Sequence, residues 1–436
     1  MNKDLAKHNL SDFLAGEGRD PLQAPPSFTA WMQAGAWAAE LYEPELLGGA
    51  DARTSINYNG RPRSVINLCS YNYLGLANHP EVIAAAHEAL NTHGLGACGS
   101  PMLSGMSDLH RELESRIAKF LNREDAMLFS SGFGGAFGTI SGLLRKSDVA
   151  ILDNRSHLSL RDGAVLSRCR TEKFEHNNPA SLDVALRRNG GHRQLVIVEG
   201  IYSMDGDFGK LVELTDVAES HRASIFIDEA HSVLGCGQHG RGAAEQFGVE
   251  GRAPLVYGTF SKAFGALGGF VAGSKEALQY LRFYAHPYVY SCALPPVVVA
   301  GLLKALEIAI REGPTLRKAL WQNADYFHEK LRELGIDTGA STTYVMPIVI
   351  GDRERMYRLC HELRRRGLWV APVDYPAVPQ NRICFRACVT AKHTRADLDE
   401  ALNILEDTLK GADSKVKAAA FRLRCKVSEL ALRMGS

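Results

Sequence analysis

Lys262 stands in the stretch Tyr257–Phe270 among glycine, serine, threonine and alanine residues, directly after the apolar run Leu255–Tyr257. A lysine that is shielded from water and has no carboxylate neighbour has a lowered pKa, so its amine can act as a nucleophile at neutral pH. Such an amine forms Schiff bases with aldehydes and ketones. The stretch by itself fits a surface lysine in a glycine- and serine-rich loop equally well. The other polar residues of the chain must decide between these two interpretations.

Several other positions carry residue types that bind a flat, charged heterocycle. Asp228 and His231 follow the apolar run Ser224–Ile227. The aspartate can hold a protonated ring nitrogen, and the histidine can reach a neighbouring oxygen. Residues 132–134, Gly-Phe-Gly, open a predicted helix whose first amides and dipole suit a phosphate. His157 follows another apolar run and can stack on an aromatic ring. Singly, each position also has an ordinary explanation, such as a helix-capping aspartate or a packed histidine.

Together these residues describe a site for pyridoxal 5'-phosphate (PLP). The aldehyde of PLP would meet Lys262, and its pyridine nitrogen would meet Asp228. An ionised carboxylate keeps that nitrogen protonated, which makes the ring an electron sink for carbanions. The expected phosphate ligands are Gly132, Phe133, Thr259 and Ser261. A nicotinamide dinucleotide is not expected, because the run GFGGAFG lacks the G-x-G-x-x-G spacing, and no P-loop motif occurs.

Composition narrows the class of protein. The chain has 436 residues, 45% apolar content and a formal net charge of +1, so no strong field attracts nucleic acid or anionic membranes. No apolar run reaches the roughly 18 residues of a membrane span, and the N-terminus lacks the apolar core of a signal peptide. Nine cysteines, an odd number, favour free thiols and a cytoplasmic location. Cys384 and Cys388 have no second cysteine pair nearby, so neither zinc nor another metal is expected.

The elements that must position these residues follow a strand–loop–helix rhythm. Apolar runs near residues 126–129, 149–152, 194–198, 224–227 and 255–257 each end in polar or glycine-rich residues. Alternating apolar strands and helices predict an α/β fold with a mostly parallel sheet, and ligands bind beyond the carboxyl ends of such strands. The predicted divisions are an N-terminal arm and helix (1–60), a large cofactor-binding domain (61–295), a smaller α+β C-terminal domain (296–411) and a basic tail (412–436).

The two ends of the chain are less informative. Aromatic and apolar residues recur at nearly helical spacing near the N-terminus, at Phe28, Trp31, Trp37, Leu41 and Tyr42, which predicts a helix packed on another part of the protein. The tail carries six basic residues against two acidic ones, with apolar residues between them. A solvated terminal helix is favoured over a helix that lies on a membrane or a partner.

The chain resembles the α-oxoamine synthases, the fold-type-I PLP-dependent acyltransferases that include serine palmitoyltransferase and 8-amino-7-oxononanoate synthase. The resemblance extends over about residues 65–395. Its most specific part is GTFSKAFGALGG, preceded by DEAH. The matching stretches, in chain order, are NLCSYNYLGL, LFSSGFGG, LDNRSHLSLRDG, VEGIYSMDGD, IDEAHSVLGCGQHGRG, GTFSKAFGALGGF, YSCALPP and FRACVTAKHT.

The resemblance implies a role for each matching residue. Lys262 would form a Schiff base with PLP and later move the α-proton of the substrate. The remaining cofactor contacts would be His157 on the ring, Asp228 at the ring nitrogen, Ser203 and His231 near the ring oxygen, and Thr259 at the phosphate. Asn72 and Arg386 would hold the substrate carboxylate, a task that suits a guanidinium.

The implied reaction is a decarboxylative condensation of serine, alanine or glycine with an acyl thioester of CoA or an acyl carrier protein, in a homodimer with active sites between the subunits. Another fold-type-I enzyme, such as an aminotransferase or a lyase, is the nearest alternative. A catalytically silent partner subunit is disfavoured, because Lys262, Asp228 and His157 are present.

The chain also departs from the family pattern at four positions. Pro101 stands where many relatives have an arginine, so the identity of the acyl group stays open. The other departures are Cys292 for a threonine, Ala136 for an asparagine and Leu234 for a glycine.

Overall fold

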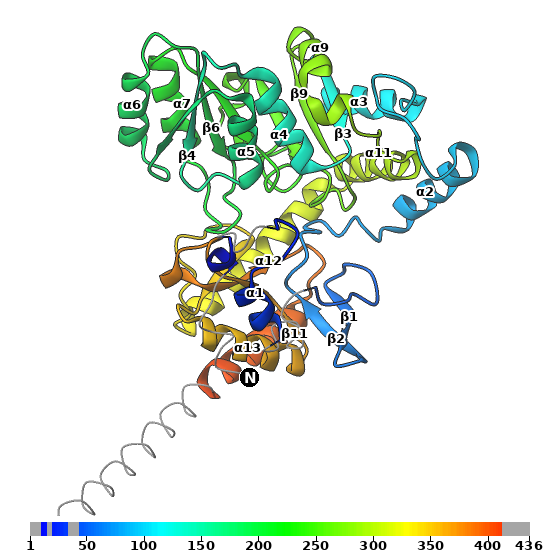
Figure 1. Cartoon of the computed structure of the whole chain (residues 1–436). Coiled ribbons are helices and arrows are strands. Elements are labelled where there is room, and N and C mark those ends of the chain that lie inside the picture. Colours follow the sequence, from blue (N-terminus) through cyan, green and yellow to red (C-terminus); the bar gives the residue numbers. More distant parts are fainter. Residues whose placement is uncertain (1–9, 15–19, 34–42, 412–436) are drawn as a thin grey trace, which may run out of the picture.

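The computed structural model describes residues 10–14, 20–33 and 43–411, and its largest sheet has seven strands (Figure 1). Every neighbouring pair is parallel except the two that involve β9, so one strand runs against the other six. This confirms the predicted mostly parallel α/β sheet. In sheet order the strands are β3 (Asp125–Phe129), β9 (Gly269–Gly273), β8 (Leu255–Thr259), β7 (Ser224–Asp228), β6 (Gln194–Glu199), β4 (Val149–Asp153) and β5 (Arg170–Phe174).

Helices cover both faces of this sheet, because alternate side chains of its central strands are apolar on both sides. In β6, Ile197 packs into one core, whereas Val196 and Val198 pack into the opposite one. The helices are α1 (Pro26–Trp31), α2 (Pro80–His93), α3 (Asp108–Phe120), α4 (Gly132–Leu143), α5 (Leu158–Ser167), α6 (Pro179–Arg188), α7 (Leu211–Ser220), α8 (Ala243–Gln246), α9 (Lys275–Tyr284), α10 (His286–Val289), α11 (Pro296–Arg311), α12 (Gly313–Glu333), α13 (Arg353–Arg366) and an unlabelled helix over residues 395–411.

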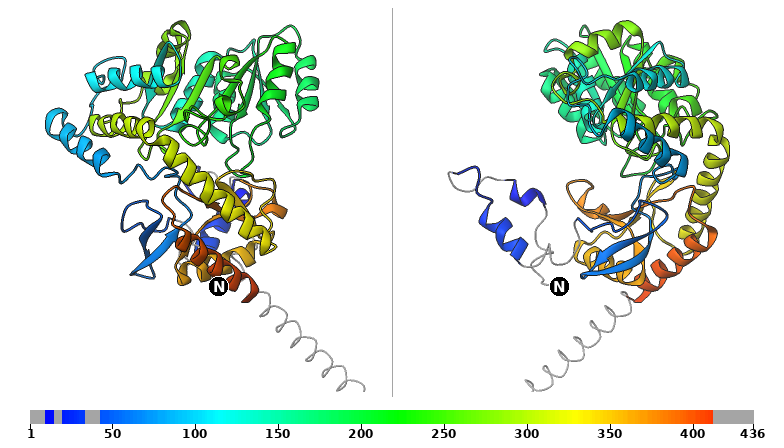
Figure 2. Two further views of the ribbon diagram at one scale, coloured as in Figure 1. Left: turned by 180° about the vertical axis from the view of Figure 1, so that it is seen from behind. Right: turned by 90° about the vertical axis from the view of Figure 1, so that its right-hand side faces the viewer.

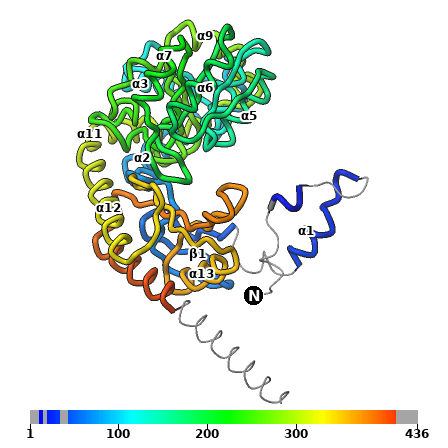
Figure 3. The backbone as a smooth tube through the Cα atoms, turned by 90° about the vertical axis from the view of Figure 1, so that its left-hand side faces the viewer, coloured from blue at the N-terminus to red at the C-terminus, as the bar shows by residue number. Residues whose placement is uncertain are grey.

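Helices α11 and α12 follow one another along one side of the molecule and lead away from the large sheet (Figures 2 and 3). Two smaller sheets lie in the other half of the molecule, below the large sheet in Figure 1. One is antiparallel, with the order β10 (Val345–Val349), β13 (Cys384–Cys388) and β12 (Ala371–Val373). The other joins the hairpin β1 (Arg53–Tyr58) and β2 (Arg61–Asn67) to β11 (Leu368–Trp369). The division expected after residue 60 falls in the turn of this hairpin. We propose that the hairpin groups with the C-terminal domain.

The five strands expected from apolar runs occur within two residues of their expected bounds, whereas β1, β5, β11 and β12 were not predicted, and β5 belongs to the large sheet. This strand, Arg-Thr-Glu-Lys-Phe, lies at the edge of the sheet and exposes most of its side chains. It therefore lacks the apolar pattern that revealed the central strands. None of the described helices combines the length and apolar character needed to cross a bilayer.

At the N-terminus, α1 contains Phe28 and Trp31, as predicted, and these side chains pack on Phe13. Trp37, Leu41 and Tyr42 lie outside the described residues, and so does the tail over 412–436.

Candidate active site

The carboxyl ends of β3, β4, β6, β7 and β8 meet at one edge of the large sheet and enclose a cavity of about 300 Å³. Eight residues predicted to bind PLP line it, so residues that are far apart in the sequence share one site. Ser203, Asn72 and Arg386 are not among its lining residues. The lining residues are Ser131, Gly132, Phe133, His157, Ser159, Glu199, Asp228, Ala230, His231, Tyr257, Thr259, Ser261 and Lys262.

Lys262 lies in a tight turn just after β8, closed by a hydrogen bond of 2.8 Å from the Gly265 amide to the Lys262 carbonyl. Its side chain is half-buried and faces the cavity. Burial lowers the pKa of the amine, and the nearby carboxylates of Asp228 and Glu199 only partly offset that effect. The neutral, nucleophilic form is therefore more accessible than in a free lysine.

Asp228 and Glu199 end adjacent parallel strands in register, so two carboxyl groups lie side by side. Burial raises the pKa of Asp228 to about 6, although Lys262 and a 2.8 Å hydrogen bond from the Ala230 amide favour its ionised form. Burial and the Asp228 charge raise the pKa of Glu199 well above its usual value. Both carboxyl groups therefore hold a proton more tightly than free acids do, and Asp228, with a pKa of about 6, ionises just below neutral pH. No role was predicted for Glu199, although it follows an apolar run and lies in the family-like stretch VEGIYSMDGD.

His157 is the N-cap of α5, and its ring nitrogen Nδ1 accepts a hydrogen bond of 3.3 Å from the Ser159 amide. Its own amide donates to the Glu199 carboxyl group at 2.6 Å. Burial and the charge of Lys262 lower the pKa of His157 to about 4. The imidazole is therefore neutral at pH 7. The predicted stacking role stays a prediction.

His231 is buried, and its Nδ1 lies 2.8 Å from the hydroxyl of Tyr73. The Tyr344 hydroxyl donates to the His231 carbonyl at 2.5 Å, so two tyrosines fix this histidine. Burial lowers the pKa of His231 well below its usual value. Tyr73 was not predicted to lie next to the site, although it belongs to the family-like stretch NLCSYNYLGL, because nothing in its own turn-like segment indicates a contact with the distant His231.

The N-terminus of α4 forms the polar end of the cavity. The first amides of a helix have no acceptor within it, which leaves those of Gly132 and Phe133 to face the cavity. Gly132 allows a close approach to β8, because a Cβ there would lie 2.4 Å from the Thr259 hydroxyl. Tyr257 donates to the Gly132 carbonyl at 2.7 Å and fixes this contact. A cradle of amides and hydroxyl groups fits a phosphate.

Arg386 on β13 lies beside the cavity. Its guanidinium packs over the ring of Tyr71 at 4.8 Å, hydrogen-bonds to the Tyr71 hydroxyl, and contacts the Ser203 carbonyl at 3.5 Å. Its buried Nε has no hydrogen-bond partner among the described residues. A guanidinium with a free donor is available to a carboxylate.

The side chain of Asn72 forms hydrogen bonds with the protein backbone. It accepts a hydrogen bond from the Ala77 amide at 3.2 Å and donates one to the Ala50 carbonyl at 3.4 Å. These contacts fix the turn that carries Tyr71 and Tyr73. The predicted contact of Asn72 with a substrate carboxylate stays a prediction.

The structure describes the surroundings of two positions, Leu234 and Cys292, at which the chain departs from the family pattern. Leu234 adopts a left-handed backbone conformation, with φ of 66°, which favours glycine and strains a branched side chain. Cys292 is exposed. The eight cysteines of the described part of the chain are free thiols.

Comparisons with known proteins agree with the geometry. A family model described as aminotransferase class I and II matches residues 63–405. An 8-amino-7-oxononanoate synthase from Thermoanaerobacter pseudethanolicus is 40% identical over 346 residues, which cover 79% of this chain and 87% of that protein. A serine palmitoyltransferase from Sphingobacterium spiritivorum is 38% identical over 352 residues, or 80% and 88% of the two chains.

Solved structures show the same relationship. The structure of a serine palmitoyltransferase from S. paucimobilis with bound PLP–myriocin superposes with a TM-score of 0.85 at 32% identity. The match covers 91% of this chain and 100% of that one.

Proposed function

This chain belongs to the aminotransferase class I and II family and, within it, to the α-oxoamine synthases, which are PLP-dependent acyltransferases. From this premise we propose that it condenses serine, alanine or glycine with an acyl thioester of CoA or an acyl carrier protein. The products would be an α-aminoketone, CO₂ and a free thiol. The observation that carries the proposal is the convergence of Lys262, Asp228, His157 and the N-terminus of α4 on one cavity.

The residues of this cavity suit each part of PLP. Lys262 would hold the aldehyde carbon, Asp228 the ring nitrogen and His231 the ring oxygen, and His157 would lie against the ring. The amides of Gly132 and Phe133, with the hydroxyl groups of Thr259 and Ser261, would hold the phosphate. When bound, PLP withdraws electrons and so stabilises a carbanion at the α-carbon of an amino acid.

Lys262 would accept the α-proton of the substrate at Nζ. A base works best when its pKa lies near the working pH, and burial moves the pKa of Lys262 in that direction. Asp228, ionised above pH 6, would stabilise a positive charge on the ring nitrogen. Glu199 beside it accepts a hydrogen bond from the His157 amide and so fixes the backbone of that residue.

Arg386 would bind the carboxylate of the amino acid through its guanidinium group. Tyr71 supports this role, because its ring stacks on the guanidinium and its hydroxyl hydrogen-bonds to it. The Tyr71 ring also lies edge-on to His231, with centroids 6.0 Å apart. Substrate and cofactor contacts therefore lie next to each other.

A stoichiometric assay tests the proposal. Purified protein loaded with PLP would receive carboxyl-labelled serine, alanine or glycine together with acyl-CoA thioesters of graded chain length. We expect one labelled CO₂ and one free thiol per turnover with at least one pair. The absence of both products with every pair, acyl carrier protein thioesters included, would reject the acyltransferase proposal. Transfer of the amino group to a keto acid without release of thiol would favour the aminotransferase alternative.

A further inference from the structure

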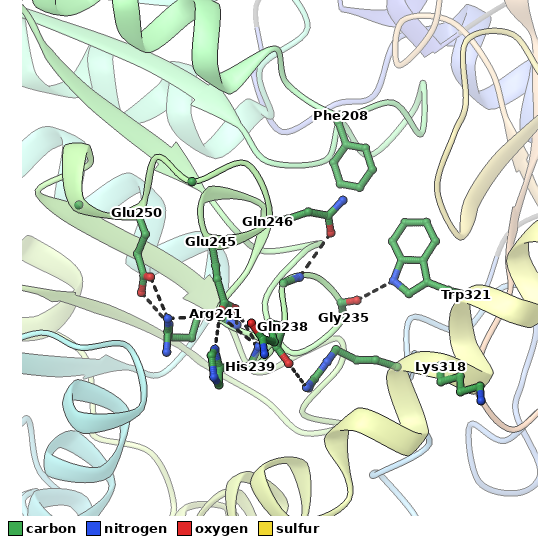
Figure 4. Close-up of a pocket in the computed structure, with 14 residues that line it drawn as sticks. Phe208, Gly235, Gln238, His239, Arg241, Glu245, Gln246, Glu250, Lys318 and Trp321 are labelled. Carbon is green, nitrogen blue, oxygen red and sulfur yellow. Dashed lines mark hydrogen bonds and ion pairs between the residues drawn. The ribbon is translucent and has the colours of Figure 1, made fainter.

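A second cleft, of about 900 Å³, lies between the loop that follows β7 and the first turns of α12 (Figure 4). It shares no lining residue with the catalytic cavity. The loop over residues 235–251 supplies most of its wall. Helix α12 supplies Arg317, Lys318 and Trp321, and Phe208 completes it.

The charged groups of the loop neutralise one another. Glu245 accepts hydrogen bonds from the His239 ring at 2.6 Å and from the Arg241 amide at 2.9 Å. The Arg241 guanidinium forms ion pairs with Glu245 at 3.2 Å and with Glu250 at 2.8 Å. These contacts hold the loop together and engage both of its carboxylates.

Two cations on α12 lack such partners. Arg317 is only 7% exposed, and its Nη2 donates to the Gln238 carbonyl at 2.7 Å. Its Nη1 is buried and has no hydrogen-bond partner among the described residues. Lys318 is exposed, and the described part of the chain pairs it with no carboxylate. Burial of the Arg317 guanidinium lowers its pKa more than the nearby charge of Glu245 raises it, and an anion in the cleft would offset the remaining cost of burial.

The guanidinium of Arg317 is held in place by glycines. A Cβ at Gly240 would lie 2.6 Å from Nη1, and one at Gly313 would lie 2.5 Å from it. Both positions must therefore lack a side chain for Arg317 to occupy this site. Such packing fixes the direction of the charge.

An aromatic wall adjoins these cations. The rings of Phe208 and Trp321 are nearly parallel, with an interplanar angle of 18° and centroids 6.0 Å apart. Trp321 is one turn from Arg317 on the same face of α12, and its Nε1 donates to the Gly235 carbonyl at 2.9 Å. The lining of the cleft thus includes two cations and a flat apolar pair, Phe208 and Trp321, which Figure 4 shows next to each other.

We propose that this cleft binds a small organic anion, whose carboxylate or phosphate meets Arg317 and Lys318 and whose apolar body lies against Phe208 and Trp321. Ligand sites commonly have this volume and combine an apolar wall with a few fixed polar groups. The ligand would bridge the loop after β7 and helix α12. Trp321 also packs on Tyr344, the tyrosine that donates to the His231 carbonyl, so one layer of side chains separates this cleft from the catalytic cavity.

Calorimetric titration of the PLP-loaded, full-length protein tests this site. The probes are benzoate and phenyl phosphate, which share an aromatic body and differ in the anion, with neutral benzamide as the matched control at constant ionic strength. We expect saturable binding of at least one anion and none of benzamide. The tighter of the two anions identifies the preferred acidic group. The visible absorbance of the cofactor should stay unchanged, because the probe lies outside the catalytic cavity.

Substitutions on α12 test which residues bind the anion. Arg317→Gln should weaken it about tenfold or more, since a charge-assisted hydrogen bond is lost, and the exposed Lys318→Gln should weaken it about threefold. Lys330→Gln, on the same helix and paired with Glu333, is the control and should bind as the parent does. If Arg317→Gln does not fold by circular dichroism, Lys318→Gln decides alone. Equal binding of benzamide, no saturable binding of either anion, or unchanged affinity in Lys318→Gln would overturn the proposal.

Discussion

Lys262 works beside two buried carboxyl groups that would otherwise hold it charged. Burial and the Asp228 charge raise the pKa of Glu199 well above its usual value, and burial raises the pKa of Asp228 to about 6. Burial of Lys262 outweighs the charges of both groups and lowers the pKa of the lysine. The environment thus makes the neutral amine of Lys262 more accessible than it is in a free lysine.

Lys262→Ala should abolish the visible absorbance of the PLP-loaded protein and lower turnover by roughly 10²–10⁴-fold or more, because both the covalent tether and the proton acceptor are lost. Absorbance spectra and the thiol-release assay measure these effects. The control is Lys275→Ala, at an exposed lysine on α9, which should keep both the visible absorbance and the turnover of the parent protein. An unchanged spectrum in Lys262→Ala would show that another amine holds the cofactor.

The contact between Tyr73 and His231 bears on which ring nitrogen of His231 carries the proton. Burial raises the pKa of the Tyr73 hydroxyl well above its usual value, so the hydroxyl stays protonated and is available as a donor to Nδ1, 2.8 Å away. We predict that it donates to this nitrogen. The neutral imidazole then carries its own proton on Nε2, the nitrogen left to serve as a donor to the ring oxygen of PLP.

Tyr73→Phe should allow both neutral tautomers of His231. It should also destabilise the fold by roughly 1–3 kcal/mol, because a buried ring nitrogen loses its donor. The ¹⁵N shifts of His231 in PLP-free protein should report the Nε2–H form in the parent and a mixture in the variant. Tyr284→Phe, at an exposed tyrosine, is the control. Identical ¹⁵N shifts in parent and Tyr73→Phe would contradict the role of Tyr73.

At the scale of elements, the end of β4 is held by a buried ion-pair network. His176 lies between Asp153, the last residue of β4, at 3.0 Å and Asp207 at 2.9 Å. Burial alone would lower the pKa of His176, but the hydrogen bonds to both carboxylates outweigh it and raise the pKa to about 10. The network secures the strand end that leads to His157.

This network predicts a pH-dependent stability. A histidine whose pKa rises on folding stabilises the protein fully below its unfolded pKa of about 6.5, and the contribution disappears as the pH approaches 10. The free-energy difference between the parent and His176→Gln should be a few kcal/mol at pH 6 and shrink steadily toward pH 10. Denaturant unfolding at a series of pH values measures it. A difference that stays constant with pH would show that His176 acts by packing and not by charge.

At the scale of the molecule, apolar side chains are exposed next to the catalytic cavity. Phe133, which lines the cavity, is 46% exposed, and on α5 Leu158 is 53% and Val165 69% exposed. Exposed apolar side chains gathered near a functional site indicate an interface. The proposed homodimer, with active sites between its subunits, would cover them.

The protein should therefore have twice the 47.7 kDa mass of one chain in light scattering at micromolar concentration. Val165→Arg should shift it toward the monomer, because a buried unpaired charge at an interface is strongly unfavourable. Val212→Arg, on α7 at the opposite face of the sheet, is the control and should remain dimeric. A monomeric parent protein would refute the homodimer.

The sequence by itself determined the central strands of the sheet, eight of the residues that line the cavity and the cofactor class. Central strands are apolar on both faces, so each has a recognisable local pattern, and parallel strands bring their carboxyl ends to one edge whatever their spacing in the chain. Residue types and strand ends were therefore enough to group Lys262, Asp228 and His157. The polar edge strand β5 has no such pattern.

Only the tertiary structure decided the contacts between segments that are remote in sequence. These include the pairing of β2 with β11, the Tyr73–His231 hydrogen bond, the register that sets Glu199 beside Asp228, and the cleft between α12 and the loop after β7. The physical reason is that desolvation and charge coupling depend on which side chains surround a group in space. Neither residue type nor local spacing carries that information, so the sequence could name Lys262 but not the environment that lowers its pKa.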